Sequence, residues 1–500
     1  MIRIRIPTLY ADLESSLQAL RRDSSQVVES RRIVENALRD GKSYYGINTG
    51  LGGLADKRIP DDQILRLQRS LILSHSAGVG DPIPRHICRL MLRLKVHALG
   101  LGHSGISWET FERLLLFAEN EWIPVVPSRG SVGASGDLAP LAHLSLPLMG
   151  LGQFWDRDGR KALPAAELLA QHRIRPLELQ AKDGLSLVNG TQMMSAYGAW
   201  VLEAALRLVK TADILGAMSL EALQGSIQPF DERIQQCRPH PGQGTIAANI
   251  RRLLRSSEIL ESHRHCGKVQ DPYCLRCMPQ VHGATRDALE YAARVLETEM
   301  NSATDNPLVF GDGDIISGGN FHGQPIALAL DLSAIALAEL ASISERRTFL
   351  LLGGHDGLPR LLMKETGINS GFMVSQYTAA ALVSENKILC HPASVDSIPT
   401  SLGQEDHQSM GSIGALKLLQ VFNNVVQVLA IELLNAAQAL DYRQPLRPGR
   451  GVEIAHEHVR SLVPHAEADF LFQRDLAQCA CLVQEAELAE RVEAEVGELA

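Results

Sequence analysis

Long apolar stretches with helical spacing constrain the fold of this chain most strongly. The run from Ser412 to Tyr442 is not interrupted by proline, and its apolar side chains recur every three or four residues. One stripe consists of Leu418, Phe422, Val425, Leu429 and Leu433. The neighbouring rows are apolar too, so we expect a helix that is buried on most sides. A second long helix is expected from Met193 to Leu223, and an alanine- and leucine-rich helix includes Ile326 to Ile343.

Few stretches have the pattern of strands, apart from a short hairpin over residues 308–317. The predicted fold class is therefore mainly α, a long antiparallel helical bundle with a loop-rich N-terminal portion. With 500 residues the chain is longer than one simple core usually supports. We predict an N-terminal loop-rich domain over 1–190, a central long-helix bundle over 191–445 and a C-terminal helical segment over 446–500. The tail from Ala477 to Ala500 is expected to be one acidic amphipathic helix.

The charge balance excludes some classes of partner. A net charge of −9 and a pI near 6.0 argue against nucleic-acid binding. Asp331 and Glu339 interrupt the most apolar run, which favours a buried bundle helix over a membrane span. The N-terminus has no apolar core of the kind a signal peptide needs. Eight cysteines are few for this length and indicate reduced thiols in a cytoplasmic protein.

One cluster raises the question of a metal site. His263, His265, Cys266, Cys274 and Cys277 fall within 15 residues, and the last two form a C-x-x-C pair. Such a pair can be a redox centre or half of a zinc site. No second C-x-x-C or H-x-x-x-H completes a tetrahedral site, so we predict no metal.

A glycine-rich stretch, Gly130 to Leu141, has the most unusual chemistry. Its centre is Ala134-Ser135-Gly136, with glycines that let the backbone fold back on itself at little steric cost. In such a turn the Gly136 nitrogen could reach the Ala134 carbonyl carbon. Ring closure and loss of water from Ser135 would give an electrophilic methylidene, which no ordinary side chain provides. The tripeptide by itself favours an ordinary glycine-rich loop capped by Asp137.

Several other stretches combine polar side chains with loops or helix ends. The loop from Tyr44 to Gly53 could close over a ligand or simply connect two helices. Gln270, Tyr273 and Arg276 are three residues apart, so a helix after Pro272 would place them on one face. Arginine is the preferred clamp for a carboxylate, although a surface ion pair would explain Arg276 too.

Six motifs taken together resemble the aromatic amino acid ammonia-lyases. They are G-S-V-G-A-S-G-D-L-A-P-L-A, Y-G-I-N-T-G, L-V-N-G-T-Q, Q-D-P-Y-x-L-R-C, G-G-N-F-H and Q-E-D-H-x-S-M-G. They occur in the family's order from about Tyr45 to Arg443. The resemblance implies that Ala134, Ser135 and Gly136 form 4-methylideneimidazole-5-one (MIO) autocatalytically, with no external cofactor. It also implies a homotetramer whose active sites each draw loops from three subunits.

The same resemblance assigns roles to individual residues. Tyr45 matches the base that removes the β-proton, for which the pKa of its phenol must fall below the usual value near ~10. Arg276 matches the carboxylate clamp, and Tyr273 matches a second catalytic tyrosine. The remaining matches are Asn189 and Gln270, which bind the carboxylate and the MIO oxygen, Phe321, which packs by the MIO ring, and Met373, which packs near the substrate ring.

The choice of substrate depends on two positions. His75 and Glu405 match residues of family members that act on histidine, and a carboxylate can bond an imidazole but would lack a partner beside a phenyl ring. The resemblance therefore implies a small amino-acid substrate, L-histidine, converted to trans-urocanate and ammonia. Departures at Leu51, Cys274, Met278 and His282 leave a histidine derivative open as the substrate. The alternative is an MIO lyase or aminomutase acting on tyrosine, phenylalanine or a histidine betaine such as ergothioneine.

Overall fold

Helices dominate the computed structural model, which describes residues 2–500, and the predicted mainly α class is confirmed. Within the described residues the named strands form three small antiparallel pairs. The hairpin expected over 308–317 is one of them. The pairs are β1 (Val79–Pro82) with β2 (Pro127–Arg129), β3 (Gln153–Trp155) with β4 (Ala162–Pro164), and β5 (Leu308–Val309) with β6 (Ile315–Ile316).

The chain divides into two compact units, and both are discontinuous in sequence. The first unit comprises residues 1–200, 292–331 and 392–416, and the second comprises 201–291, 332–391 and 417–500. The boundaries fall inside four long helices and just after α16 (Met373–Leu389). Neither unit coincides with a segment of the expected division at residues 190 and 445, which stays a prediction. The four long helices are α9 (Gln192–Ala222), α14 (Met278–Met300), α15 (Gln324–Leu351) and α17 (Gly411–Asp441).

The first unit contains short helices packed around α4 (Arg85–Gly100). Pro84 precedes this helix, and every residue from Leu90 to Gly100 is buried. A side chain at Gly100 would lie 2.5 Å from Leu20, which explains how α1 can pack closely on α4. The other α-helices of this unit are α1 (Leu9–Arg22), α2 (Ser25–Arg39), α3 (Ile64–His75), α5 (Trp108–Glu119), α6 (Leu138–Ser145), α7 (Ala165–Gln171) and α8 (Asp183–Val188).

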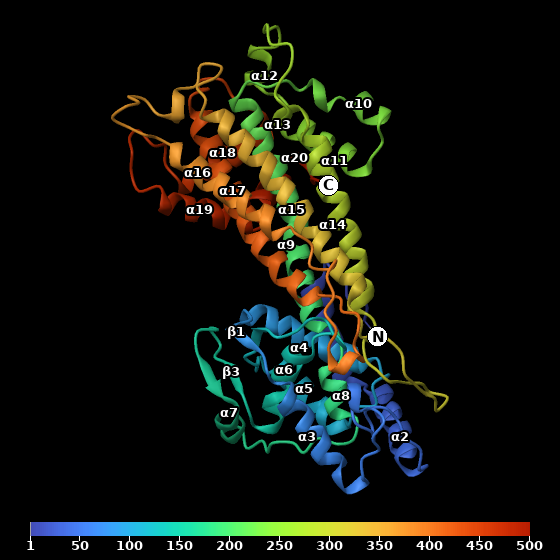
Figure 1. Cartoon of the computed structure of the whole chain (residues 1–500). Coiled ribbons are helices and arrows are strands. Elements are labelled where there is room, and N and C mark those ends of the chain that lie inside the picture. Colours follow the sequence, from blue (N-terminus) through green and yellow to red (C-terminus); the bar gives the residue numbers. More distant parts are fainter. Residues whose placement is uncertain (1) are drawn as a thin grey trace. The chain divides into compact units, whose positions relative to one another are not determined.

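In the second unit, segments of the four long helices run side by side (Figure 1) and share buried polar contacts. Arg347 on α15 forms an ion pair with Glu432 on α17 at 2.5 Å, and Ser219 on α9 donates to the same carboxylate. His282 on α14 lies 2.8 Å from Asp213 on α9. The other α-helices are α10 (Glu232–Cys237), α11 (Pro241–Leu253), α12 (Glu258–Ser262), α13 (Tyr273–Arg276), α16 (Met373–Leu389), α18 (Arg450–Leu462), α19 (Gln473–Gln484) and α20 (Glu487–Val496).

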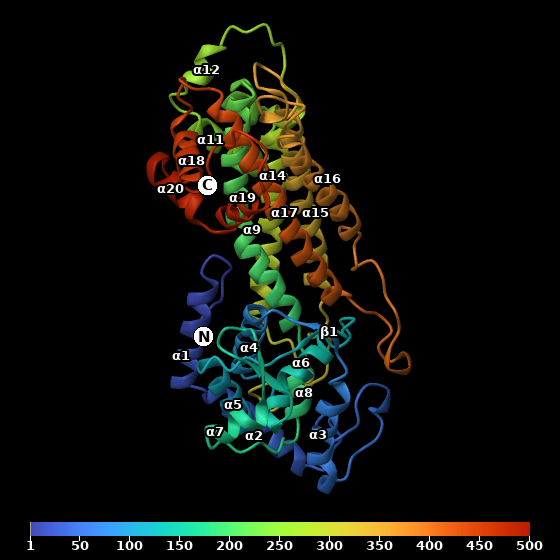
Figure 2. The same ribbon diagram turned by 90° about the vertical axis from the view of Figure 1, so that its left-hand side faces the viewer.

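The prediction of one helix from Ala477 to Ala500 is wrong. Glu485 has extended backbone angles (φ −81°, ψ 152°) and separates α19 from α20. The second of the two short helices, α20, packs against α18 (Figure 2). Each of the two helices buries apolar side chains, among them Leu482 and Val483 on α19 and Leu488 and Val492 on α20.

Two helices, α15 and α17, are long and apolar enough to cross a membrane by length and composition. In their most apolar windows, 67% and 56% of the residues are buried inside the protein. Core helices of a bundle have this degree of burial, which agrees with the expected buried bundle helix.

Candidate active site

A cavity of about 290 Å³ in the first unit brings together five of the residues singled out in the sequence. They come from loops far apart in the chain, between residues 45 and 405. They are Tyr45, Ser135, Asn189, Phe321 and Glu405, and the cavity is completed by Gly52, Ala55, Asn306, Ser317, Gly318 and Gln404. None of these eleven lining residues carries a positive side chain. The cavity therefore presents one carboxylate and neutral polar groups.

The tripeptide forms a tight turn at the edge of this cavity. Ser135 and Gly136 both have left-handed backbone angles, with φ of +50° and +80°. A side chain at Gly136 would lie 2.0 Å from the Gly190 carbonyl oxygen, so only glycine fits there. Gly190 also donates its N–H to the Ser135 carbonyl oxygen at 3.3 Å. The compact turn and the absence of a side chain at Gly136 fit a backbone that closes on itself.

Asp137 connects the turn to the start of α9 and to the 189–190 segment. Its side chain is fully buried, and one carboxylate oxygen accepts from the N–H groups of Met193 and Met194 at 2.9 and 3.1 Å. These N–H groups belong to the first turn of α9, where an anion is stabilised. Burial nevertheless raises the pKa of Asp137 to about 7. Its backbone N–H donates to the Gly190 carbonyl at 2.8 Å, which fixes the turn to the 189–190 segment.

Asn189 is held by groups that the sequence did not single out. Its amide nitrogen donates to Asp305 Oδ1 at 3.1 Å and to the Asn306 carbonyl at 2.9 Å. Its backbone carbonyl accepts from Lys95 Nζ at 2.5 Å. The one available signal for Lys95 was a lysine inside an apolar helical stretch, which indicates burial but not a partner. These contacts leave Asn189 buried and fixed at the cavity wall.

The surroundings of Tyr45 shift the pKa of its phenol in the direction opposite to the expected one. Burial raises the pKa of its phenol, and the nearby charge of Glu405 raises it further, although the phenol oxygen accepts from the Gly52 N–H at 3.2 Å. The expectation of a lowered pKa is therefore wrong for this cavity of the isolated chain. The physical reason is first that the phenol is buried, and second that the lining residues include a carboxylate and no cation.

Glu405 is oriented by its own loop. Its Oε2 accepts from Thr400 Oγ1 at 2.8 Å, and Gln408 donates to its backbone carbonyl at 2.7 Å. The loop also contacts the Tyr45 loop, because the Gly53 N–H donates to Ser401 Oγ at 3.1 Å. Thr400 and Ser401 were missed because their roles depend on contacts between distant loops.

His75, the last residue of α3, lies within the electrostatic field of Glu405. Burial lowers the pKa of the imidazole, and the Glu405 charge opposes that change. Its Nδ1 lies 3.1 Å from Ser74 Oγ. His75 is not among the cavity's lining residues, yet Glu405 acts electrostatically on both His75 and Tyr45.

The other four predicted residues, Gln270, Tyr273, Arg276 and Met373, belong to the second unit. Only Tyr273 and Arg276 lie in α13, a single turn, so the expected shared helical face with Gln270 is wrong. The Arg276 guanidinium carbon lies 4.4 Å from the centre of the Tyr273 ring, and Arg276 Nε donates to the Asp271 carbonyl. Tyr273 is 69% exposed. Met373 is half-buried at the start of α16.

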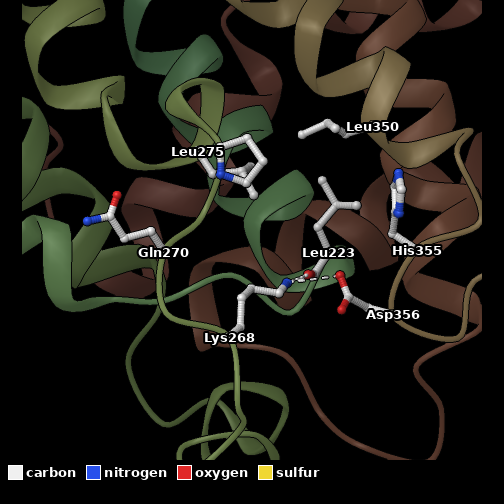
Figure 3. A pocket seen from close by; sticks show the side chains of 8 residues that line it. Leu223, Lys268, Gln270, Leu275, Leu350, His355 and Asp356 are labelled. Atoms are coloured by element: carbon white, nitrogen blue, oxygen red, sulfur yellow. Dashed lines mark hydrogen bonds and ion pairs between the residues drawn. The ribbon is translucent and has the colours of Figure 1, made fainter.

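Gln270 lines a second cavity, of about 280 Å³, in the second unit. Figure 3 shows Lys268 extending toward Leu223 and Asp356, while the Gln270 amide points the other way. Lys268 Nζ lies 2.9 Å from Asp356 Oδ2. Because its cation is already paired, this cavity has no free charge that would select an anionic ligand.

The cysteines of the C-x-x-C pair and the neighbouring Cys266 differ in exposure. Cys274 is buried, which raises the pKa of its thiol to about 11, whereas Cys266 is exposed. Within residues 2–500, no three or more His, Cys, Asp or Glu side chains are placed to hold a metal ion together.

Comparisons with known proteins place the chain in a family. The family profile described as aromatic amino acid lyase matches residues 11–461. A histidine ammonia-lyase from Sorangium cellulosum (strain So ce56) is 53% identical over 481 residues, which are 94% of this chain and 93% of that protein.

Solved structures agree with this assignment. The crystal structure of histidine ammonia-lyase from Trypanosoma cruzi is 42% identical, has a TM-score of 0.87 and covers 94% of this chain and 89% of its own. The structure of tyrosine aminomutase from Streptomyces globisporus is 35% identical, has a TM-score of 0.90 and covers 98% of each chain. The profile match and the similarity over nearly the whole length show that this chain belongs to the aromatic amino acid lyase family.

Proposed function

We propose that this chain is a carbon–nitrogen lyase that eliminates ammonia from L-histidine and forms trans-urocanate. The observation that carries the proposal is the position of Glu405 in the same cavity as Tyr45 and Ser135. A half-buried carboxylate in a cavity favours a substrate with an N–H group or a positive charge at its side-chain end. The 53% identity to a histidine ammonia-lyase supports the same substrate.

The prosthetic group of the proposal is MIO, formed from Ala134, Ser135 and Gly136. The turn geometry supports it, because Gly136 has no room for a side chain and Ser135 is held in a left-handed conformation. Gly190 and Asp137 would hold the group through the backbone contacts described above. When formed, MIO supplies an electrophilic carbon for the substrate amine.

The remaining steps use ordinary side chains. The Tyr45 phenolate removes the β-proton of the substrate, and Asn189 orients the substrate carboxylate at the wall of the cavity. Phe321 packs beside the MIO ring, while His75 and Glu405 bind the imidazole. Gln270, Tyr273, Arg276 and Met373 complete the site, with Arg276 as the carboxylate clamp.

The proposed enzyme is a homotetramer with shared active sites. In each site these four residues come from other copies of the chain. Arg276 of another copy would bring the positive charge that the cavity lacks, and this would lower the pKa of Tyr45. Exposed apolar side chains on α15, α16 and α17 support contact between copies. They include Leu328, Ile335, Val374, Tyr377, Ile388 and Ile413. We also propose that the enzyme acts in the cytoplasm and binds neither nucleic acid nor a membrane.

A second candidate is favoured by the similarity to tyrosine aminomutase, whose fold superposes closely on this chain. The same fold and prosthetic group would then act on tyrosine, on phenylalanine or on a histidine betaine. Beside a phenyl ring the Glu405 carboxylate would keep its bond from Thr400 but gain no partner from the substrate, which disfavours the first two substrates.

A substrate panel separates these candidates. The purified protein is incubated with histidine, tyrosine, phenylalanine and ergothioneine, and products are identified by chromatography and mass spectrometry. We expect trans-urocanate and ammonia from histidine as the fastest reaction. Faster turnover of tyrosine, or a β-amino acid as the main product, would overturn the histidine assignment.

A further inference from the structure

Lys95 is a buried cation that the proposed reaction does not use. It lies on α4 between the buried residues Leu94 and Val96, and its side chain is only 2% exposed. Its Nζ lies 2.5 Å from the Asn189 carbonyl oxygen. Burying an ammonium group costs several kcal/mol unless it gains specific interactions, so its position beside the active-site cavity calls for an explanation.

The peptide group between Asn189 and Gly190 connects Lys95 to the tripeptide. Its oxygen accepts from the ammonium of Lys95, and its N–H donates to the Ser135 carbonyl oxygen at 3.3 Å. A charge at the oxygen end of a peptide polarises the group and strengthens the donor at its other end. Lys95 can therefore act on the Ser135 carbonyl without touching it.

That carbonyl is attached to the carbon that must change when Ser135 loses water. The Cα–H and Cβ–O bonds of Ser135 break, a Cα=Cβ double bond forms, and the proton and hydroxyl leave as one water. The second water leaves when the Gly136 nitrogen bonds to the Ala134 carbonyl carbon: the carbonyl oxygen departs with the hydrogens of the Gly136 and Ser135 amides, and a C=N bond to the Ser135 nitrogen remains. Negative charge develops on the Ser135 carbonyl oxygen as its Cα–H bond breaks, and a strong donor stabilises that charge.

The surroundings keep a charge available on Lys95. Burial and the positive charge of Lys182 lower its pKa, the charges of Asp305 and Asp137 raise it, and the result is about 7. Lys182 is itself paired with Asp305 at 2.7 Å. Asp305 and Asp137 therefore oppose the loss of charge that burial alone would cause.

We propose that Lys95 is a positioning residue for maturation of the active site, which promotes the dehydration of Ser135 by polarising the Asn189–Gly190 peptide. The proposal rests on the proposed function, because it requires MIO to form from the tripeptide. It assigns to α4 a part in building the electrophile.

Intact mass tests this without relying on enzyme activity. The wild-type chain and the variants Lys95→Met, Lys95→Gln and Lys95→Arg are synthesised in a cell-free extract, and the fraction that is two waters lighter is followed over time. We expect about tenfold slower loss of water for the Met and Gln variants, because both lack the charge. Lys95→Arg keeps the charge and should mature close to the wild-type rate.

The control is His97→Asn on the same helix. His97 is equally buried, but it lies 2.7 Å from Ser16 on α1 and has no contact with the 189–190 peptide. Circular dichroism and gel filtration check that each variant folds, and Lys95→Gln, which keeps a neutral donor, replaces the Met variant if that one is insoluble. Wild-type rates in the Met and Gln variants, or an Arg variant as slow as Gln, would overturn the proposal. A wild-type chain that keeps its full mass would instead overturn the proposed function.

Discussion

At the residue scale, specificity depends on one carboxylate. Glu405 is oriented by Thr400 and lies in the cavity with Tyr45. A site built to bond an N–H group rejects ligands that lack one, because the buried polar group is then left without a partner. Selectivity for histidine should therefore depend on the charge and hydrogen bonding of Glu405 more than on the shape of the cavity.

We predict that Glu405→Gln reduces kcat/KM for histidine by about 100-fold or more, since a charge-assisted hydrogen bond is lost. Steady-state kinetics with histidine and phenylalanine measure the change, and the preference for histidine should narrow. Asp396→Asn, an exposed change of the same charge in the same loop, serves as the control. Equal losses for both amino acids would contradict the specificity role.

Tyr45 should be essential for the chemical step. Tyr45→Phe removes the phenol that is proposed as the base, and we predict a fall in kcat of about 10²–10⁴-fold. The intact mass should still be two waters lighter, because Tyr45 is not part of the tripeptide. Kinetics on protein with a verified mass make the measurement. A kcat within a factor of a few of wild type would rule out Tyr45 as the base.

Much of the cavity could be predicted from the residues that carry its motifs. Tyr45, Ser135, Asn189, Phe321 and Glu405 were all singled out and lie together. Lys95 could not be predicted, because its partner is a backbone carbonyl that a sequence does not distinguish. The direction of the Tyr45 pKa shift was also missed, because it depends on which charges lie nearby and not on the motif.

At the element scale, the periodicity of apolar residues predicted which helices exist better than it predicted where they end. The ends of α9 and α17 were expected within one residue of their observed positions, because apolar spacing continues along their whole length. The break between α19 and α20 was missed because Glu485 is not a helix breaker by composition. The length of α13 was overestimated for a related reason. A spacing of three residues places side chains on one face only if the helix includes all of them, and α13 begins at Tyr273, after Gln270.

The end of α17 gives a prediction about pH and stability. Although burial opposes it, hydrogen bonds from His456 and His465 and the charge of Arg460 lower the pKa of Asp441 to about 2. A carboxylate with a lowered pKa contributes stability above its unfolded pKa of ~3.9, and that contribution is lost as pH falls from about 5 toward 2. The contribution at neutral pH is about 2 kcal/mol.

Asp441→Asn should therefore lower the free energy of unfolding at pH 7 by about 2 kcal/mol and have much less effect near pH 2. Urea denaturation followed by circular dichroism at several pH values measures both. Glu467→Gln is the control, because Glu467 lies 3.9 Å from the same His465 but is exposed. The same loss at every pH would show that the Asp441 charge is not the cause.

At the scale of the whole molecule, the division into units could not be anticipated. Sequence patterns mark loops as domain boundaries, but here most boundaries fall inside α9, α14, α15 and α17. The sequence of a continuous apolar helix does not show at which residue the helix passes from one unit to the other. The distribution of site residues was equally hidden: Tyr45 and Ser135 belong to the first unit, whereas Tyr273 and Arg276 belong to the second.

This distribution makes shared active sites testable by mixing inactive chains. Tyr45→Phe and Arg276→Met chains with different tags are co-expressed, and assemblies that carry both tags are purified. If Tyr45 and Arg276 of one site come from different copies, about a quarter of the sites in random mixtures have both native residues. We therefore predict that histidine turnover reappears, although each variant alone is inactive.

The matched control uses two residues of one cavity. Tyr45 and Ser135 line the same cavity of the first unit, so both come from one copy. Mixtures of Tyr45→Phe with Ser135→Ala chains should stay inactive, because no site can then contain both native residues. Recovery in the first mixture alone would establish that each site combines residues of different copies, and it would explain how a cavity that lacks a cation gains one. Failure in both mixtures would mean that Tyr45 and Arg276 act within one chain.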